Sequence, residues 1–323
     1  MRSDQDEPDD AMSRFDWFRD RLRPPWDCVA SSWVPTGFDA YARILHPVRD
    51  ENGQPLIRWV DVSRWSGVAL EPSVQWCHVA LPEVAPSVEP PWSGQGGPRV
   101  GSLSRSDTVE LVRRLDPWTS GGCSFGVWEG YGSDLTVDGP IFEDVPRRSD
   151  EMTVLELPWR SYAMFDGPVT GATCFMTSRF QSPNLWWSED RSWFIAREID
   201  LPWTYVAGPR RLIDELLADS EIEALESSPD ERLDLTLPSW LEDRVRGAVD
   251  DVIESGSTSI EFALGTASVT LMPLGRKNSV LVVRSDRRSG WGGTNIPVTD
   301  QGDTALRREI KDAVLRAILG LVE

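Results

Sequence analysis

The sequence predicts an α+β fold, with a larger, mostly antiparallel sheet domain and flanking helices, followed by a small two-layer α+β module. Two observations predict it. Over residues 33–205, short strand-like runs are separated by turn signals. Near the end of the chain, two amphipathic helical patterns enclose three short strand-like runs. The predicted domains are therefore residues 26–228 and 229–323, and an acidic lead-in, residues 1–25, is expected to be disordered.

Turn signals and aromatic runs predict the strands of the larger domain. The runs FDAYARILH (38–46) and LIRWV (56–60) flank Asn52-Gly53, which predicts a hairpin. The clearest hairpin is NLWWSEDRSWFIAREI (184–199), in which two aromatic-rich runs enclose a polar turn. Further strands are expected at 124–129, 152–157, 161–165 and 204–206.

Capping patterns predict three helices in the larger domain. Asp107 is expected to cap a helix over 107–115. A second helix runs from Pro209 to Ala218, because proline is favoured at the first position of a helix. A shorter third helix is expected to begin at Ser220.

The C-terminal module is predicted as helix, three strands and helix. Its first helix begins at Ser239, where Ser239-x-x-Glu242 forms a capping box. Strands are expected at 259–264, 267–271 and 279–284, and a final helix at 304–319. The loop RSDRRSGWGG combines arginine with tryptophan, which suits an anion or an acidic partner surface, although a solvated loop is the more common structure. Its candidate binding residues are Arg284, Arg287, Arg288 and Trp291.

The chain is acidic, and the charge is uneven. The formal net charge is −19. Residues 1–228 hold 21 basic and 37 acidic side chains, a net of −16, whereas residues 229–323 hold 12 and 15, a net of −3. A field of that sign repels phosphate backbones and anionic lipid surfaces, so we expect neither a nucleic acid nor a membrane partner. With no signal-peptide pattern near Met1, the sequence predicts a cytoplasmic protein.

Cysteine and histidine give little support for a metal site or a nucleophile. Cys28, Cys77, Cys123 and Cys174 are widely spaced, and a cytoplasmic chain is expected to keep them as thiols. There are only two histidines, and neither has a local chelating neighbour. We therefore expect no metal and no cofactor.

The sequence contains 16 tryptophans, many of them beside turn residues. Such rings either fill a core or form an aromatic surface that binds a partner. Any one tryptophan is more commonly a core residue, but the set predicts at least one exposed aromatic patch. The candidate binding residues are Trp128, Tyr131, Trp186, Trp187 and Trp203.

Three carboxylates are the candidates for acid–base chemistry. Glu129 lies between Trp128 and Tyr131 in a glycine-rich run, and Glu198 and Asp200 share one face of an extended segment. Two close carboxylates can raise one another's pKa and act as a pair. Solvated or arginine-paired carboxylates are the more common outcome in so acidic a chain.

The runs GFDAYARILHP, RWVDVSRWSG, CSFGVWEGYG and LWWSEDRSWFIAREIDLPWTYVAG resemble a group of uncharacterised actinobacterial proteins. The resemblance covers roughly residues 33–226. It implies a bacterial cytoplasm and agrees with the preference for arginine over lysine, but it implies no activity, ligand or site residue.

The sequence therefore predicts a non-enzymatic, cytoplasmic protein-binding module whose acidic, tryptophan-rich surface takes a protein partner, plausibly a basic one. A first alternative is a hydrolase that acts on a small or sugar-like substrate through Glu129, Glu198 and Asp200. A second is a module that senses a small ligand, which requires a deep pocket in place of a flat patch.

Overall fold

The computed structural model describes residues 15–49, 55–83, 88, 90–92, 97–137, 153–158, 160–233, 238–255, 260–264, 267–274, 279–286, 290–297, 308 and 310–314. The chain forms two compact units. The larger unit comprises Met1–Pro47, Glu71–Ser73 and Arg99–Asp234, and the smaller unit comprises Val48–Leu70, Val74–Pro98 and Leu235–Glu323. The α+β class is confirmed, while a domain boundary after residue 228 stays a prediction.

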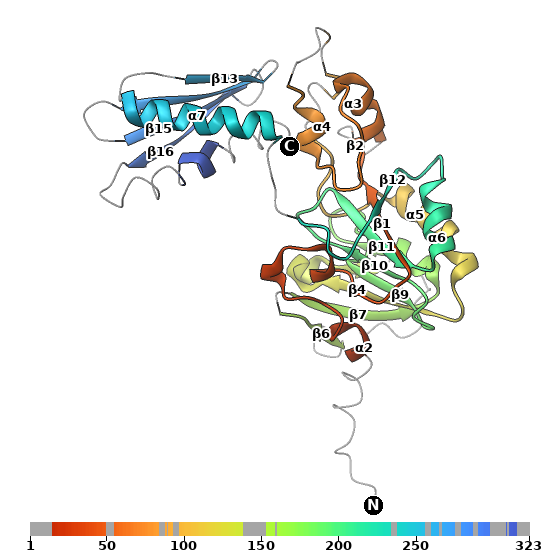
Figure 1. The fold of residues 1–323 in the computed structure, drawn as a ribbon. Helices are drawn as coiled ribbons and strands as arrows, with labels where there is room; N and C mark the ends of the chain where they lie inside the picture. Colours follow the sequence, from red (N-terminus) through yellow and green to blue (C-terminus); the bar gives the residue numbers. More distant parts are fainter. Residues whose placement is uncertain are drawn as a thin grey trace, which may run out of the picture. The chain divides into compact units, whose positions relative to one another are not determined.

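The larger unit is built on an eight-stranded sheet with the order β12-β1-β11-β10-β9-β4-β7-β6 (Figure 1). Every neighbouring pair is antiparallel. The strands are β1 Ala40–Leu45, β4 Cys123–Trp128, β6 Val154–Glu156, β7 Ser161–Gly167, β9 Leu185–Ser188, β10 Phe194–Arg197, β11 Trp203–Gly208 and β12 Ala224–Ser227. The predicted hairpin over 184–199 is present, with Phe194 opposite Trp187.

Helices and short turns connect these strands. The α-helices are α2 Asp16–Arg19, α5 Arg105–Leu115 and α6 Arg210–Leu217. The 3-10 turns are η1 Pro25–Asp27, η2 Ala30–Ser32, η3 Asp116–Trp118, η4 Glu129–Asp134 and η6 Val169–Thr173. A two-stranded ribbon pairs β5 Thr136–Val137 with β8 Phe175–Met176.

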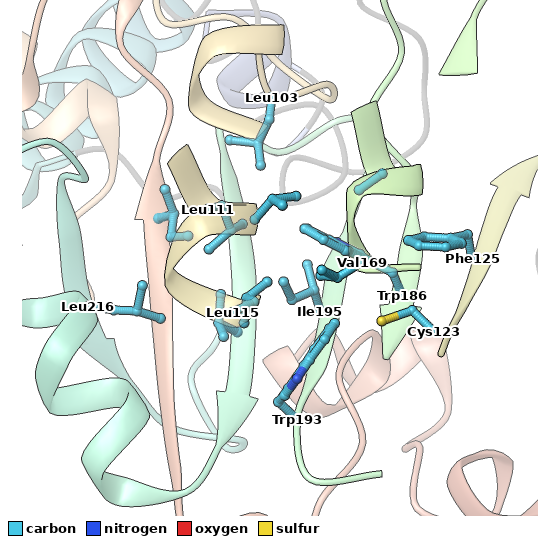
Figure 2. Close-up of a cluster of buried hydrophobic side chains, with 14 of the residues drawn as sticks. Leu103, Leu111, Leu115, Cys123, Phe125, Val169, Trp186, Trp193, Ile195 and Leu216 are labelled. Carbon is cyan, nitrogen blue, oxygen red and sulfur yellow. The ribbon is translucent and has the colours of Figure 1, made fainter. Parts of the chain in front are cut away.

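The main core lies between one face of the sheet and the helices α5 and α6. Because side chains alternate along a strand, Phe125, Trp186 and Ile195 point to the same face. They meet Leu111 and Leu115 of α5 in a buried cluster (Figure 2). Four of the fully buried side chains in the described part of the chain are tryptophans, namely Trp59, Trp186, Trp193 and Trp203. Trp76, Trp92 and Trp187 are buried as well, so many of the tryptophans are core residues.

The opposite face of the sheet is covered by an aromatic N-terminal segment. Phe15 and Phe18 are fully buried. The Phe18 ring centroid lies 5.1 Å from that of Trp187 and 5.2 Å from that of Phe194. Residues 15–25 are therefore part of the fold rather than a disordered lead-in, because these apolar rings outweigh the acidic character of the surrounding sequence.

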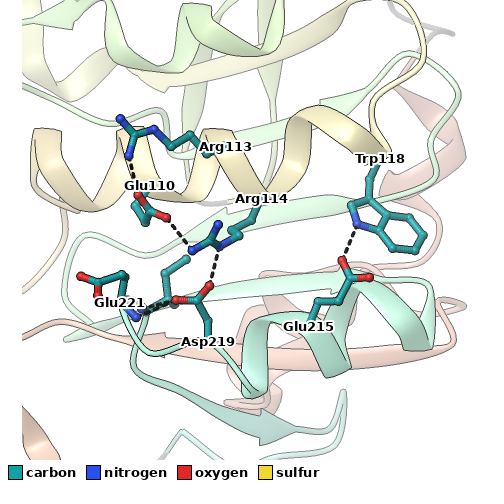
Figure 3. Close-up of polar contacts among 8 residues, drawn as sticks. Glu110, Arg113, Arg114, Trp118, Glu215, Asp219 and Glu221 are labelled. Carbon is teal, nitrogen blue, oxygen red and sulfur yellow. Dashed lines mark hydrogen bonds and ion pairs between the residues drawn. The ribbon is translucent and has the colours of Figure 1, made fainter.

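Salt bridges and hydrogen bonds join α5 to the α6 region (Figure 3). The Arg114 guanidinium contacts Asp219 and lies 2.7 Å from a carboxylate oxygen of Glu110. The Trp118 indole N–H donates to Glu215 at 3.0 Å. Arg114 is partly buried and bridges two carboxylates, so this cluster holds the helices in register over the core.

Three predicted local structures are corrected. The N-cap of α5 is Ser104, whose hydroxyl accepts the N–H of Asp107 at 3.1 Å, so Asp107 lies inside the helix. Ser220 begins no helix, because Asp219 accepts two backbone N–H groups and turns the chain into β12. The run 38–46 pairs with β11 and β12 instead of with 56–60, and the antiparallel partner of β3 (Pro55–Ile57) is β2 (Val48–Arg49), with Val48 opposite Ile57.

The smaller unit contains a four-stranded antiparallel sheet, order β13-β14-β15-β16, and α-helices. Residues 310–314 are also helical and lie within the range 304–319 predicted for the final helix. Its helices are α3 Trp59–Ser66, α4 Trp76–Ala80 and α7 Ser239–Ser255. Its strands are β13 Ile260–Leu264, β14 Ala267–Leu274, β15 Ser279–Asp286 and β16 Gly290–Pro297, beside a ribbon of β2 Val48–Arg49 and β3 Pro55–Ile57. The sequence predicts only the first three strands of this sheet, because the glycine-rich β16 lacks an alternating apolar pattern.

Candidate functional site

A pocket of about 540 Å³ lies in the larger unit, beneath the N-terminal segment. We call residues 16–33 the N-terminal wall. The remaining sides come from the β6–β7 turn and from the strands β7, β9 and β10. The lining residues are Asp16, Arg19, Asp20, Leu22, Arg23, Pro24, Pro25, Trp26, Ser32, Trp33, Leu157, Pro158, Arg160, Tyr162, Leu185, Ala196 and Arg197.

Leu185 and Ala196 of the sheet line the pocket floor. Gly126 pairs with Leu185 and Met164 in the register of the sheet, and Ala196 lies opposite Leu185. The two faces of β10 differ, so Ala196 faces the pocket while Ile195 lies in the main core. The floor of the pocket is therefore mostly apolar.

The N-terminal wall is held at both of its ends. Upstream, Phe15 and Phe18 pack against the sheet. Downstream, the N–H of Ala30 donates to the Glu231 carbonyl at 2.8 Å, and the Leu233 N–H donates to Cys28 at 2.8 Å. These contacts fix the wall, so the pocket is largely preformed.

Between these anchors, a rigid turn presents Trp26 to solvent. Pro24 and Pro25 restrict the backbone before Trp26, and Cys28, at φ +49°, ends the turn. The Trp26 side chain is 73% exposed, in contrast to the buried tryptophans of the core. An exposed ring on a rigid turn at a pocket rim suits stacking against a ligand.

Arginines are the commonest charged residues of the pocket. Arg19 lies 3.4 Å from Asp16, and Arg23 lies 3.3 Å from Asp230. Both pairs are solvent-exposed, so each contributes little to stability. Their guanidinium groups can exchange these partners for a ligand at small cost.

The other two arginines have structural partners. Arg197 is buried and donates to the carbonyls of Pro183 and Ser182 and to the Tyr131 hydroxyl. Arg160 pairs with Glu198, and its terminal nitrogen lies 3.5 Å from Asp200.

Arg160 gathers several of the candidate residues. Its guanidinium carbon lies 5.0 Å from the Trp128 ring centroid, and Trp128 lies 5.3 Å from Tyr131. The structure thus brings together Trp128, Tyr131, Glu198 and Asp200, as a network around two arginines. Glu198 and Asp200 are therefore paired with arginine and do not form a free acid–base pair.

The remaining carboxylate candidate does not join this network. Glu129 is exposed on η4, and among the contacts between described residues none links it to Glu198 or Asp200. Burial raises the pKa of the Cys123 thiol to about 12, which disfavours the thiolate form that a nucleophilic cysteine uses. In the part of the chain that the structure describes, no group of three or more His, Cys, Asp or Glu side chains has metal-binding geometry.

The tryptophan candidates for partner binding are mostly interior. Trp186, Trp187 and Trp203 are buried, with 1%, 4% and 2% of their surface exposed, so they cannot form an exposed docking patch. Trp128 and Tyr131 are partly buried. Among the described side chains, Trp26, Val88 and Val100 are the exposed large apolar ones. The sequence does not single out Trp26, although the Pro-Pro-Trp run could have identified it.

The arginine–tryptophan candidates of the smaller unit are placed only in part. Arg284 lies on β15 opposite Gly292, and Trp291 lies on β16 opposite Ser285. Arg287 and Arg288 lie outside the described residues.

The buried carboxylate Glu198 predicts a pH dependence. Burial raises its pKa above 4.5, although Arg160 opposes the shift. The folded protein therefore takes up this proton before the unfolded chain does, and the contribution of Glu198 to stability grows as the pH falls towards 4.5. We expect the difference in unfolding free energy between the natural protein and Glu198→Gln to favour the natural protein more at pH ~5 than at pH ~7.

Asp219 supplies a control of opposite sign. Burial alone would raise its pKa, but hydrogen bonds from Arg114 and from two backbone N–H groups outweigh burial and lower it. The difference between the natural protein and Asp219→Asn should therefore shrink as the pH falls below 3.8. Urea unfolding at several pH values measures both, and a Glu198→Gln difference that shrinks between pH ~7 and ~5 would contradict the assignment.

Among the described residues, no helix combines the length and the apolar character needed to cross a bilayer. Comparisons with protein-family models, with curated proteins and with solved structures gave no match to this chain.

Proposed function

We propose that the larger unit is a binding module for a small ligand, which it takes into the pocket beneath the N-terminal wall. One observation carries the proposal: a 540 Å³ pocket with an apolar floor opens beside an exposed tryptophan on a rigid turn. Small-molecule pockets typically measure about 300–1,000 Å³ and combine apolar walls with a few polar groups.

The geometry supports this function better than the two others considered. A docking surface needs exposed indoles, and the named candidates Trp186, Trp187 and Trp203 are buried. A carboxylate hydrolase needs a free pair, and Glu198 and Asp200 both contact Arg160. Binding of a basic protein by the acidic surface stays a prediction from the sequence.

A neutral fluorescent probe tests the proposal. N-phenylnaphthylamine is an uncharged aromatic compound whose emission rises in an apolar site. We expect the full chain to bind it at one site, and Trp26→Ala to weaken binding about fivefold, as expected for one lost aromatic contact of ~1 kcal/mol. Fluorescence titration gives both dissociation constants.

Val100→Ala is the matched control, because Val100 is 48% exposed in the same unit but does not line the pocket. This variant should bind the probe like the natural protein. No saturable binding, or equal effects of the two substitutions, would overturn the proposed function.

A further inference from the structure

We infer that the ligand of this pocket is an aromatic anion, a planar ring system that carries a carboxylate, sulfonate or phosphate group, and that Arg19 and Arg23 receive its charge. The inference rests on the proposed function and adds the chemical class of the ligand. Three features of the pocket lead to it.

The first feature is the sign of the charge. The whole chain carries −19, yet the pocket is lined by four arginines and two aspartates. The excess of arginine over aspartate in the lining makes this site less repulsive to an anion than the acidic chain as a whole, although carboxylates paired with Arg19, Arg23 and Arg160 offset part of the positive charge.

The second feature is the availability of two of these arginines. Arg19 and Arg23 are 38% and 50% exposed, and each has one exposed aspartate at more than 3.2 Å. An incoming carboxylate or phosphate can replace such a weak partner with a shorter, charge-assisted hydrogen bond. Arg160 and Arg197 are held by partners of their own and therefore shape the wall.

The third feature is the arrangement of rings near these charges. Arg23 is followed directly by Pro24, Pro25 and Trp26, so the sequence places a cation and an exposed indole on the same rigid segment. Trp33, Tyr162 and Leu185 also line the pocket. A flat ring fits between such surfaces while its anionic group reaches the arginines.

Two dyes with nearly the same rings separate this inference from the proposed function. Anilinonaphthalene sulfonate carries a sulfonate, whereas N-phenylnaphthylamine has none. We expect the double variant Arg19→Gln/Arg23→Gln to bind the sulfonate dye about tenfold more weakly, because charge-assisted hydrogen bonds to the sulfonate are lost and solvent screens part of their strength. The same variant should bind the neutral dye like the natural protein, which also shows that the pocket has kept its structure.

Arg113→Gln is the matched control. Like Arg19, Arg113 is an exposed arginine that pairs with a carboxylate three residues earlier in its helix, Glu110 at 2.9 Å. It does not line the pocket. This variant should bind both dyes normally. Raising the salt concentration should weaken only the sulfonate dye.

The outcomes are distinguishable. Suppose that the neutral dye binds and that Trp26→Ala weakens it, but that the double arginine variant binds the sulfonate dye normally. The proposed small-ligand pocket is then supported, and the inference that its ligand is an anion is wrong. If Arg113→Gln weakens the sulfonate dye as much as the double variant does, the dye reports general surface charge and the inference is wrong. If neither dye binds saturably, the proposed function fails as well.

Discussion

Replacing Trp186 with alanine is expected to destabilise the larger unit by about 3–5 kcal/mol, the usual cost of deleting a large buried ring. Trp186 is 1% exposed, and its ring lies 6.2 Å from that of Phe125 and 5.7 Å from that of Trp193. The strands β4 and β10 on either side hold the backbone in place, so the structure cannot collapse to fill the cavity.

Urea unfolding followed by far-ultraviolet circular dichroism measures this loss. The control is Trp26→Ala, which removes the same side chain from an exposed position and should change the unfolding free energy by less than ~0.5 kcal/mol. Equal losses for the two variants would contradict the assignment of Trp186 to the core and Trp26 to the rim.

The second large effect is expected at the buried ion pair of Arg43 and Glu231. Their side chains are 0% and 6% exposed, and the Arg43 nitrogen lies 3.2 Å from the Glu231 carboxylate. Arg43 also lies over the Trp203 ring, 4.9 Å from its centroid. Arg43→Met leaves the carboxylate buried without its cation, which is expected to cost about 3–5 kcal/mol.

A double substitution tests the physical reason for this loss. Arg43→Met with Glu231→Leu removes both charges, so most of the stability should return. Urea unfolding of the two single variants and the double variant completes a thermodynamic cycle. If the double variant is as unstable as the sum of the single ones, the pair is not coupled and packing alone explains the loss.

Local signals predicted the parts of the fold in which the chain contacts its own neighbours. The 184–199 hairpin is present because its strands need only a short polar turn. The helix predicted over 107–115 is present and begins earlier, at Arg105, because Ser104 caps it; Ser and Asp are both favoured N-cap residues, so the local sequence does not distinguish Ser104 from Asp107. Pairing of β1 with β11 and β12 joins residues 158 to 186 positions apart, and no local pattern encodes it.

The candidate site was predicted only in part, because its residues come from distant parts of the chain and no local pattern shows which of them meet. Carboxylates and rings at Trp128, Tyr131, Glu198 and Asp200 are conspicuous in the sequence, and they do come together. The residue that joins most of them, Arg160, lies in an ordinary turn.

The acidic composition near the N-terminus suggested disorder. Phe15 and Phe18 instead anchor this segment to the sheet, which creates the pocket wall.

The most direct test of the ligand-binding account is a crystal structure of the full chain with anilinonaphthalene sulfonate. The account predicts the dye in the pocket, with its rings between Trp26 and Leu185 and its sulfonate within hydrogen-bonding distance of Arg19 or Arg23. A pocket filled by the protein's own side chains, or a dye bound only elsewhere on the larger unit, would contradict it.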